Sequence, residues 1–277
     1  MTLLYIAFDV VQEVFARRNM LVLLCLIIAG LLALTFSLNL EVVEGALAGM
    51  RLFGKQLTGA ITPVDVALRP IFQALAYATF YNGLLFGIVA SADIAPKMLA
   101  PGRVELLLSL PVRRVELVLG TYLGVLVVAL ITTSFAVGGV SLVLFWKAGF
   151  VTGAPAVGAV MAVLGFMPIY AVMLFAASLA RSAAMSAGAG LMLYLAGVVT
   201  SWREEFLSWF RSGTTRAVLE VLIAPIPRLH GLAEVGAQAA TDQPVASGVL
   251  FPLVGIALAF AGAALVAACF VVSEKNY

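Results

Sequence analysis

The chain has 277 residues, of which 63% are hydrophobic and only 11% are charged, and its mean hydropathy is +1.12. Soluble domains carry about 25% charged residues, so a soluble fold of this size could not hide so much apolar surface, and we expect the chain to lie in lipid. The net charge of +2 gives no reason to expect nucleic acid as a partner, and the single histidine, His230, excludes multi-histidine metal chemistry. Cys25 and Cys269 each sit inside a long apolar run, which favours packing residues over a disulfide framework.

The N-terminal segment 3–18 has the pattern of an amphipathic helix that lies on the membrane surface. Its apolar and polar residues separate onto two faces of a helix. An ordinary cytosolic segment that leads into the first span is the alternative interpretation. The apolar face carries Leu3, Ala7, Val10, Val11 and Val14, and the polar face carries Tyr5, Asp9, Gln12 and Glu13.

Long intervals without charged residues mark the transmembrane spans, because about 20 apolar residues are needed to cross a 30 Å hydrocarbon core. We therefore predict an all-α membrane protein with six transmembrane helices in a single domain, 1–277. The predicted spans lie near residues 20–40, 71–92, 117–145, 155–180, 182–201 and 248–272.

Basic residues close to the span ends predict the orientation, because such residues favour the cytosolic side. Arg17, Arg18, Arg113, Arg114 and Arg181 all fall on the inner side if the N-terminus is cytosolic. The expected topology has both termini in the cytosol, an outer loop at 39–69, a main inner loop at 93–115 and a long outer segment at 201–246.

One segment of the outer loop, 49–56, nearly spells a phosphate-binding loop. Its last position holds Gln56 where Ser or Thr would bind magnesium, and neither a preceding buried strand nor a following helix is expected. The sequence therefore predicts no nucleotide site here and no enzymatic activity in this chain.

The inner loop is the most informative stretch. Pro101-Gly102 breaks the chain, Arg103–Leu110 can form two helical turns, and Pro111 ends them but suits the start of the next helix. The leucine residues of such a short cytosolic helix need a cover. Lipid headgroups, the ends of neighbouring spans or a partner protein could each provide it.

The run Glu105-Leu-Leu-Leu-Ser-Leu-Pro111-Val-Arg-Arg114-Val-Glu116-Leu resembles the signature loop of the permease subunits of type-2 ABC exporters. In that family a Glu-Leu-Leu-rich stretch, a proline and an arginine precede the third span. The predicted layout is similar along the whole chain, and the subgroup associated with multicopper-enzyme maturation is the most similar one. A bacterial or archaeal plasma membrane is the location that this resemblance implies.

The resemblance implies a permease dimer, formed with a second copy or a similar permease, and a separate cytosolic ATPase subunit that binds ATP and magnesium. The inner loop would then carry a coupling helix that docks on the ATPase. By position, docking would fall to Arg103, Glu105, Leu106, Ser109 and Leu110, flanked by Lys97, Arg113 and Arg114. Snorkelling at the membrane surface is an equal alternative for Arg113 and Arg114.

The second span holds the main polar candidates for a translocation path or an interface, namely Tyr77, Tyr81 and Asn82. Tyr77 and Tyr81 are four residues apart and so share a helix face, although ordinary packing is the commoner role for such a pair. An ion-coupled carrier is one alternative function, but it needs ionisable residues inside the spans, and none is expected near mid-membrane. A membrane anchor or sensor that does not transport is the other alternative. The sequence does not reveal the cargo.

Overall fold

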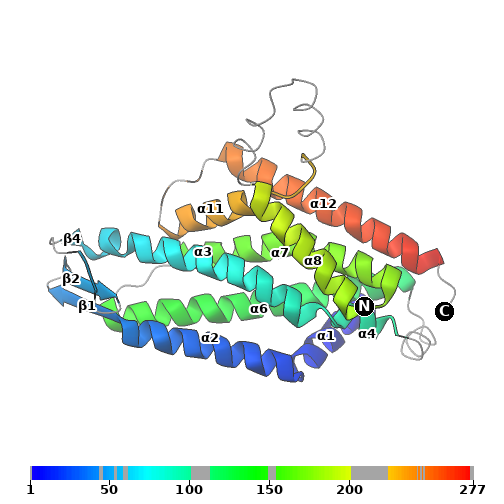
Figure 1. Cartoon of the computed structure of the whole chain (residues 1–277), viewed down its shortest axis with the longest axis horizontal. Helices are drawn as coiled ribbons and strands as arrows, with labels where there is room; N and C mark the ends of the chain where they lie inside the picture. The colour runs from blue at the N-terminus through cyan, green and yellow to red at the C-terminus, as the bar shows by residue number, and fades with distance from the viewer. Residues whose placement is uncertain are drawn as a thin grey trace.

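The computed structural model describes residues 2–43, 46–52, 55–58, 62–100, 113–148, 154–200, 224–241, 243, 245 and 247–274. Within these ranges most residues are helical. The helices are α1 (Thr2–Phe15), α2 (Arg18–Ser37), α3 (Val64–Ser91), α4 (Ile94–Met98), α6 (Arg114–Ala148), α7 (Ala154–Ala180), α8 (Ala183–Val199), α11 (Leu229–Ala240) and α12 (Ser247–Glu274). Figure 1 shows the long helices running side by side, with the two ends of the chain at the same end of the bundle.

Among the described residues, five stretches are long and apolar enough to cross a membrane, and they match five of the six predicted spans: Met20–Ser37, Arg69–Met98, Arg114–Lys147, Ala156–Ala180 and Ser247–Glu274. The fifth predicted span, 182–201, corresponds to α8. This helix is equally apolar but has only 17 residues, about 26 Å of helical rise. Five helical stretches with the length and composition to span a membrane are therefore confirmed, and a sixth crossing remains a prediction.

Helix α7 forms the centre of the bundle. Of its apolar window, 67% is buried, against 6% for α2 at the periphery. Helices α3, α6, α8, α11 and α12 all pack around α7. Ile169, Tyr170 and Met173 of α7 have no exposed surface. The bundle is thus organised around one apolar helix with other helices on all its sides.

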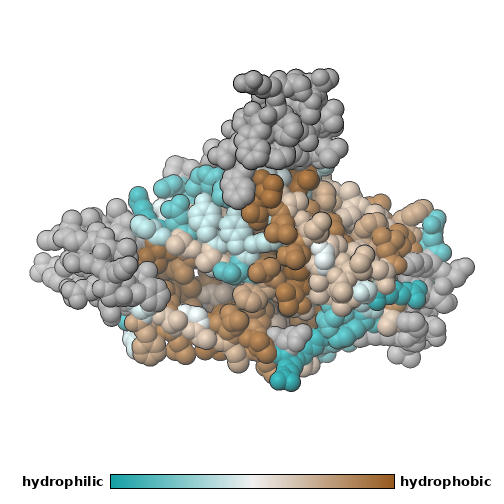
Figure 2. Space-filling view, in the orientation of Figure 1, coloured by the Kyte–Doolittle hydropathy of each residue, from teal (hydrophilic) through white to brown (hydrophobic). Residues whose placement is uncertain are grey.

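Helix α1 confirms the predicted N-terminal helix, although it ends at Phe15 and Arg18 already belongs to α2, and it lies in a groove on α6. Its place on the membrane surface stays a prediction. Ile6, Val10 and Val14 are buried against α6. The groove exists because two glycines of α6 lack side chains: a Cβ at Gly120 would lie 2.7 Å from the Ile6 side chain, and one at Gly124 would lie 2.8 Å from the Ala7 carbonyl oxygen. Figure 2 shows a hydrophilic stripe along α1 on the side that faces away from the bundle.

The predicted outer loop 39–69 contains a small sheet that the sequence analysis did not predict. Strands β1 (Leu38–Val43), β2 (Ala46–Leu52), β3 (Lys55–Thr58) and β4 (Thr62–Pro63) pair antiparallel, with β1 on one side of β2, and β3 and β4 on the other. Residues 38–42 alternate between apolar and polar side chains, and this period of two indicates a strand. The false phosphate loop falls on β2 and β3, where Leu52 pairs with Lys55. A strand, not a helix, follows the lysine.

The turn between α7 and α8 lies at Arg181, as the sequence predicted. Arg181 has a φ of 51°, in the left-handed region that a non-glycine residue seldom adopts. Its backbone N–H donates to the Ala177 carbonyl at 2.8 Å, which closes the end of α7. Described residues 224–241 of the predicted outer segment 201–246 include α11, which packs along α7 and α3.

Candidate functional site: a tyrosine and histidine cluster

Tyr77 and Tyr81 share one face of α3, as their four-residue spacing predicts. Their rings are nearly parallel, with centroids 6.5 Å apart and an interplanar angle of 11°. The third predicted residue, Asn82, does not join them. It lines a cavity between α2 and α3, because one residue along a helix turns the side chain by about 100°. The predicted trio is therefore divided between two faces of α3.

His230 of α11 completes this cluster. Its Nδ1 lies 2.8 Å from the Tyr81 hydroxyl, a hydrogen bond between residues 149 positions apart. Its ring also stacks on Tyr77, with centroids 6.2 Å apart and an interplanar angle of 13°. Tyr194 of α8 meets the Tyr81 ring edge-on at 6.5 Å. Three helices thus contribute to one polar aromatic group, which we call the Tyr–His cluster: Tyr77, Tyr81, Tyr194 and His230.

The histidine lies near the midpoint of α3, which corrects the sequence analysis. Tyr81 is twelve residues from Arg69, where the apolar stretch begins, and ten from Ser91, where α3 ends, about 18 and 15 Å of helical rise. Helix α11 starts beside this midpoint and runs back toward the sheet, since Ala240 at its end lies beside Phe72 and Gly158. An ionisable side chain is therefore present where none was expected.

A carboxylate on α11 extends the polar surface. Glu234 is one turn after His230, accepts a hydrogen bond from the Gln238 side chain at 3.3 Å, and interacts electrostatically with the Tyr77 hydroxyl. Figure 2 shows a patch of neutral and hydrophilic surface over the middle of α3 and over α11, between hydrophobic areas. The cluster is thus at the surface of a single chain, and in lipid such groups need a protein cover or a water-filled path.

A second polar cluster is a set of ion pairs at the end of the bundle where α1 meets α2 and where α3 leads into α4. Arg17, between α1 and α2, bonds Glu13 at 2.5 Å and Asp93 at 2.6 Å, and Asp93 also pairs with Lys97 of α4. The Arg17 side chain is only 14% exposed. We call these four residues the corner network. It ties the start of the chain to the segment that leads into the inner loop.

The residues predicted to dock on an ATPase, Arg103, Glu105, Leu106, Ser109 and Leu110, lie outside the described residues. The flanking residues have structural partners. Lys97 belongs to the corner network, and the Arg113 backbone N–H donates to the Glu116 carboxylate at 3.2 Å. The Arg114 guanidinium donates to the carbonyls of Val272 and Ser273, at 3.4 and 3.0 Å. Arg114 therefore contacts the end of α12, and its docking or snorkelling at the membrane surface stays a prediction.

Within the described ranges, no group of three or more His, Cys, Asp and Glu side chains could hold a metal ion. A scan of protein-family models and a search of curated proteins find no match to this chain. The functional interpretation therefore depends on the sequence motif and on the geometry of the Tyr–His cluster and the corner network.

Proposed function

We propose that this chain is the permease subunit of an ABC exporter, working as a dimer with a separate cytosolic ATPase subunit. The observation that carries the proposal is the arrangement of helix ends around the inner loop. The loop leaves from α4, which the corner network ties to α1 and α2, and returns at α6, whose Arg114 holds the end of α12. A force applied to the loop would reach most of the helices at this end.

The experiment is purification of the tagged chain from its native membranes in mild detergent, with identification of the proteins that accompany it. We expect an ABC ATPase subunit in the complex. Glu105→Lys should weaken its binding, because the loss of a buried charge pair at an interface costs about 2–5 kcal/mol. Lys55→Ala, in the false phosphate loop, is the matched control and should leave the complex intact. Enzyme-like ATP hydrolysis by the purified chain alone would contradict the proposal.

In a dimer, the face that carries the Tyr–His cluster is the part of this chain best suited to a translocation path. Its polar groups lie near the midpoint of α3 and on the surface of one chain, so a second copy would cover them and leave a polar seam between the subunits. Apolar walls with few polar groups favour a hydrophobic or peptidic cargo over a highly charged one.

An ion-coupled carrier is the second candidate, and His230 is the observation that favours it. A histidine bonded to a tyrosine near the midpoint of a membrane helix is a group of the kind that relays protons in carriers. Vesicles that contain the purified chain without an ATPase, loaded with a pH-sensitive dye, distinguish the two functions. Proton flux that is lost in His230→Gln would support the carrier, and its absence would support the permease.

A further inference from the structure

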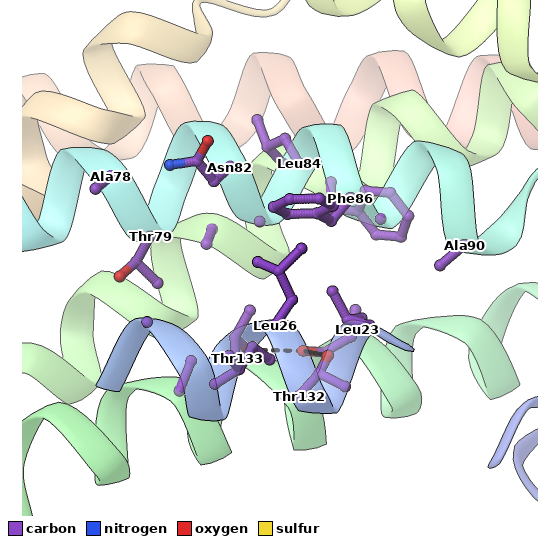
Figure 3. A pocket seen from close by; sticks show the side chains of 18 of the residues that line it. Leu23, Leu26, Ala78, Thr79, Asn82, Leu84, Phe86, Ala90, Thr132 and Thr133 are labelled. Carbon is purple, nitrogen blue, oxygen red and sulfur yellow. Dashed lines mark hydrogen bonds between the residues drawn. The ribbon is translucent and has the colours of Figure 1, made fainter. Parts of the chain in front are cut away.

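A cavity of about 640 Å³ lies between α2, α3 and α6, with α7 behind it. Ligand cavities usually measure about 300–1,000 Å³. None of the residues that line this one is charged. Figure 3 shows Leu26 of α2 directed toward Phe86 of α3, with Thr132 and Thr133 of α6 below.

Most of the hydroxyl groups in the cavity wall are occupied by their own helices. Thr132 and Thr133 donate to carbonyls one turn earlier in α6, at 2.8 and 2.7 Å, and Ser91 donates to the Gly87 carbonyl at 2.6 Å. Ser37 donates to Leu34 in the same way. Thr79 and Asn82 of α3 are the other polar side chains of the lining. A buried water needs two to four polar partners, so this wall favours an apolar occupant.

The cavity opens sideways between α2 and α3. Helix α2 is the least buried of the membrane helices, and Leu21, Val22 and Leu32 on its outer side are more than half exposed. Figure 2 shows the hydrophobic surface hollowed between these two helices. In a membrane, the medium outside this opening is the hydrocarbon of the bilayer. Lipid chains therefore have direct access to the cavity, without a passage through water.

The shape also fits a hydrocarbon chain. The cavity follows α2 from Met20 to Ser37, about 26 Å of helical rise. One leaflet of the hydrocarbon core is only about 15 Å deep. The cavity can thus hold a whole hydrocarbon chain lengthwise. A hydrocarbon chain that fills it supplies the dispersion contacts that an empty cavity would lack.

We propose that this cavity holds one acyl chain of a bilayer phospholipid, which enters between α2 and α3. The inference does not depend on the permease assignment. The bound acyl chain would keep α2 and α3 apart. Its contacts with α2 would replace protein contacts, which are few for this helix.

The test uses the full chain in vesicles of phosphatidylethanolamine and phosphatidylglycerol that contain a phosphatidylcholine with a photoreactive diazirine in its acyl chain. Crosslinked peptides are then mapped by mass spectrometry. We expect stronger labelling of Leu26, Phe86 and Thr133, inside the cavity, than of Val266 and Phe270, which are exposed on α12. Equal labelling of both sets would overturn the proposal, and so would crosslinks at Leu26 that join two copies of the chain.

Two glycines of the wall allow the cavity to be filled without a clash. A Cβ at Gly30 meets no atom within 4 Å, and one at Gly83 meets only Thr133, at 4.0 Å. Labelling in Gly30→Leu/Gly83→Leu should fall to the level of the α12 surface. The matched control is Gly255→Leu/Gly262→Leu on α12, where a Cβ also meets no atom within 4 Å, and it should label like the unmodified chain. Unchanged labelling in Gly30→Leu/Gly83→Leu would contradict the binding of an acyl chain in the cavity.

A second measurement distinguishes lipid from water in the same place. Thr79→Cys, in a chain with Cys25→Ala and Cys269→Ala, places one thiol in the wall. We expect it to react with a membrane-soluble maleimide and to resist a charged, water-soluble one. Rapid reaction with the charged reagent would show a water-filled cavity and overturn the proposal.

Discussion

At the scale of single residues, the hydrogen bond between Tyr81 and His230 is a polar contact that adds to the packing of α11 on α3 and α7. It joins residues 149 positions apart and lies beside stacked and edge-on aromatic contacts. The ring contacts remain if a hydroxyl is deleted, so the hydrogen bond can be tested separately from the packing.

We expect Tyr81→Phe to destabilise the folded protein by about 0.6 kcal/mol, the average for hydrogen bonds between membrane helices, with about 1.7 kcal/mol as the upper limit. A double-mutant cycle with His230→Gln, measured by unfolding in mixed detergent micelles, should give a coupling energy of the same size. Tyr194→Phe is the control, because it deletes a hydroxyl from the same cluster but keeps the edge-on ring contact. Additive effects of the two main substitutions would show that the hydrogen bond contributes nothing.

Arg181 is the other informative residue, because its backbone is strained at a tight turn. Arg181→Gly should raise the free energy of unfolding, since an L residue in the left-handed region costs about 1–2 kcal/mol, less the extra freedom that glycine gives the unfolded chain. Arg181→Val, with a branched Cβ, should lower it. Thermal unfolding of both variants in detergent checks the prediction, and equal melting temperatures would contradict it.

At the scale of elements, the docking of α1 on α6 depends on the absence of two side chains. The Cβ of any residue other than glycine at position 124 would lie 2.8 Å from both the Ala7 carbonyl oxygen and the Val10 side chain. The Ala7 carbonyl oxygen belongs to the backbone and cannot rotate away, so α1 as a whole would have to move.

We therefore expect Gly124→Leu to displace α1 and to expose Val10, which has no exposed surface in the docked helix. Overpacking of this kind costs about 1–3 kcal/mol. A Val10→Cys reporter should react faster with a maleimide in the Gly124→Leu background. Gly138→Leu on the same helix, where a Cβ meets no atom within 4 Å, should leave the rate unchanged. An unchanged rate in Gly124→Leu would show that α1 does not depend on this groove.

The elements also show how far the sequence alone could predict the structure. Charge-free intervals located five apolar membrane helices, and the amphipathic pattern located α1, because both signals are local. The sheet at 38–63 was missed although its first strand alternates apolar and polar residues. The contact of His230 with α3 could not be derived, because it depends on how two segments far apart in the chain meet. Tyr77 and Tyr81 were predicted to share a face, but their partner on α11 was not.

At the scale of the whole molecule, one chain leaves much apolar surface and one polar cluster uncovered. Lipid covers the apolar surface, but the Tyr–His cluster requires protein or water. In the assembly with an ATPase subunit that we propose, we expect two copies of the chain, or one copy and a similar permease. Native mass spectrometry in mild detergent measures this number directly, and a stable complex with a single permease chain would contradict the prediction.

The groove that holds α1 has a consequence for synthesis on the ribosome. Gly120 and Gly124 are made more than a hundred residues after Val10, which takes roughly 5 to 20 seconds at ordinary elongation rates of about 5–20 residues per second. During this interval the groove on α6 does not yet exist, and we expect the apolar face of α1 to rest on the membrane surface. We therefore expect the amphipathic pattern of α1 to serve the nascent chain first and the folded protein later.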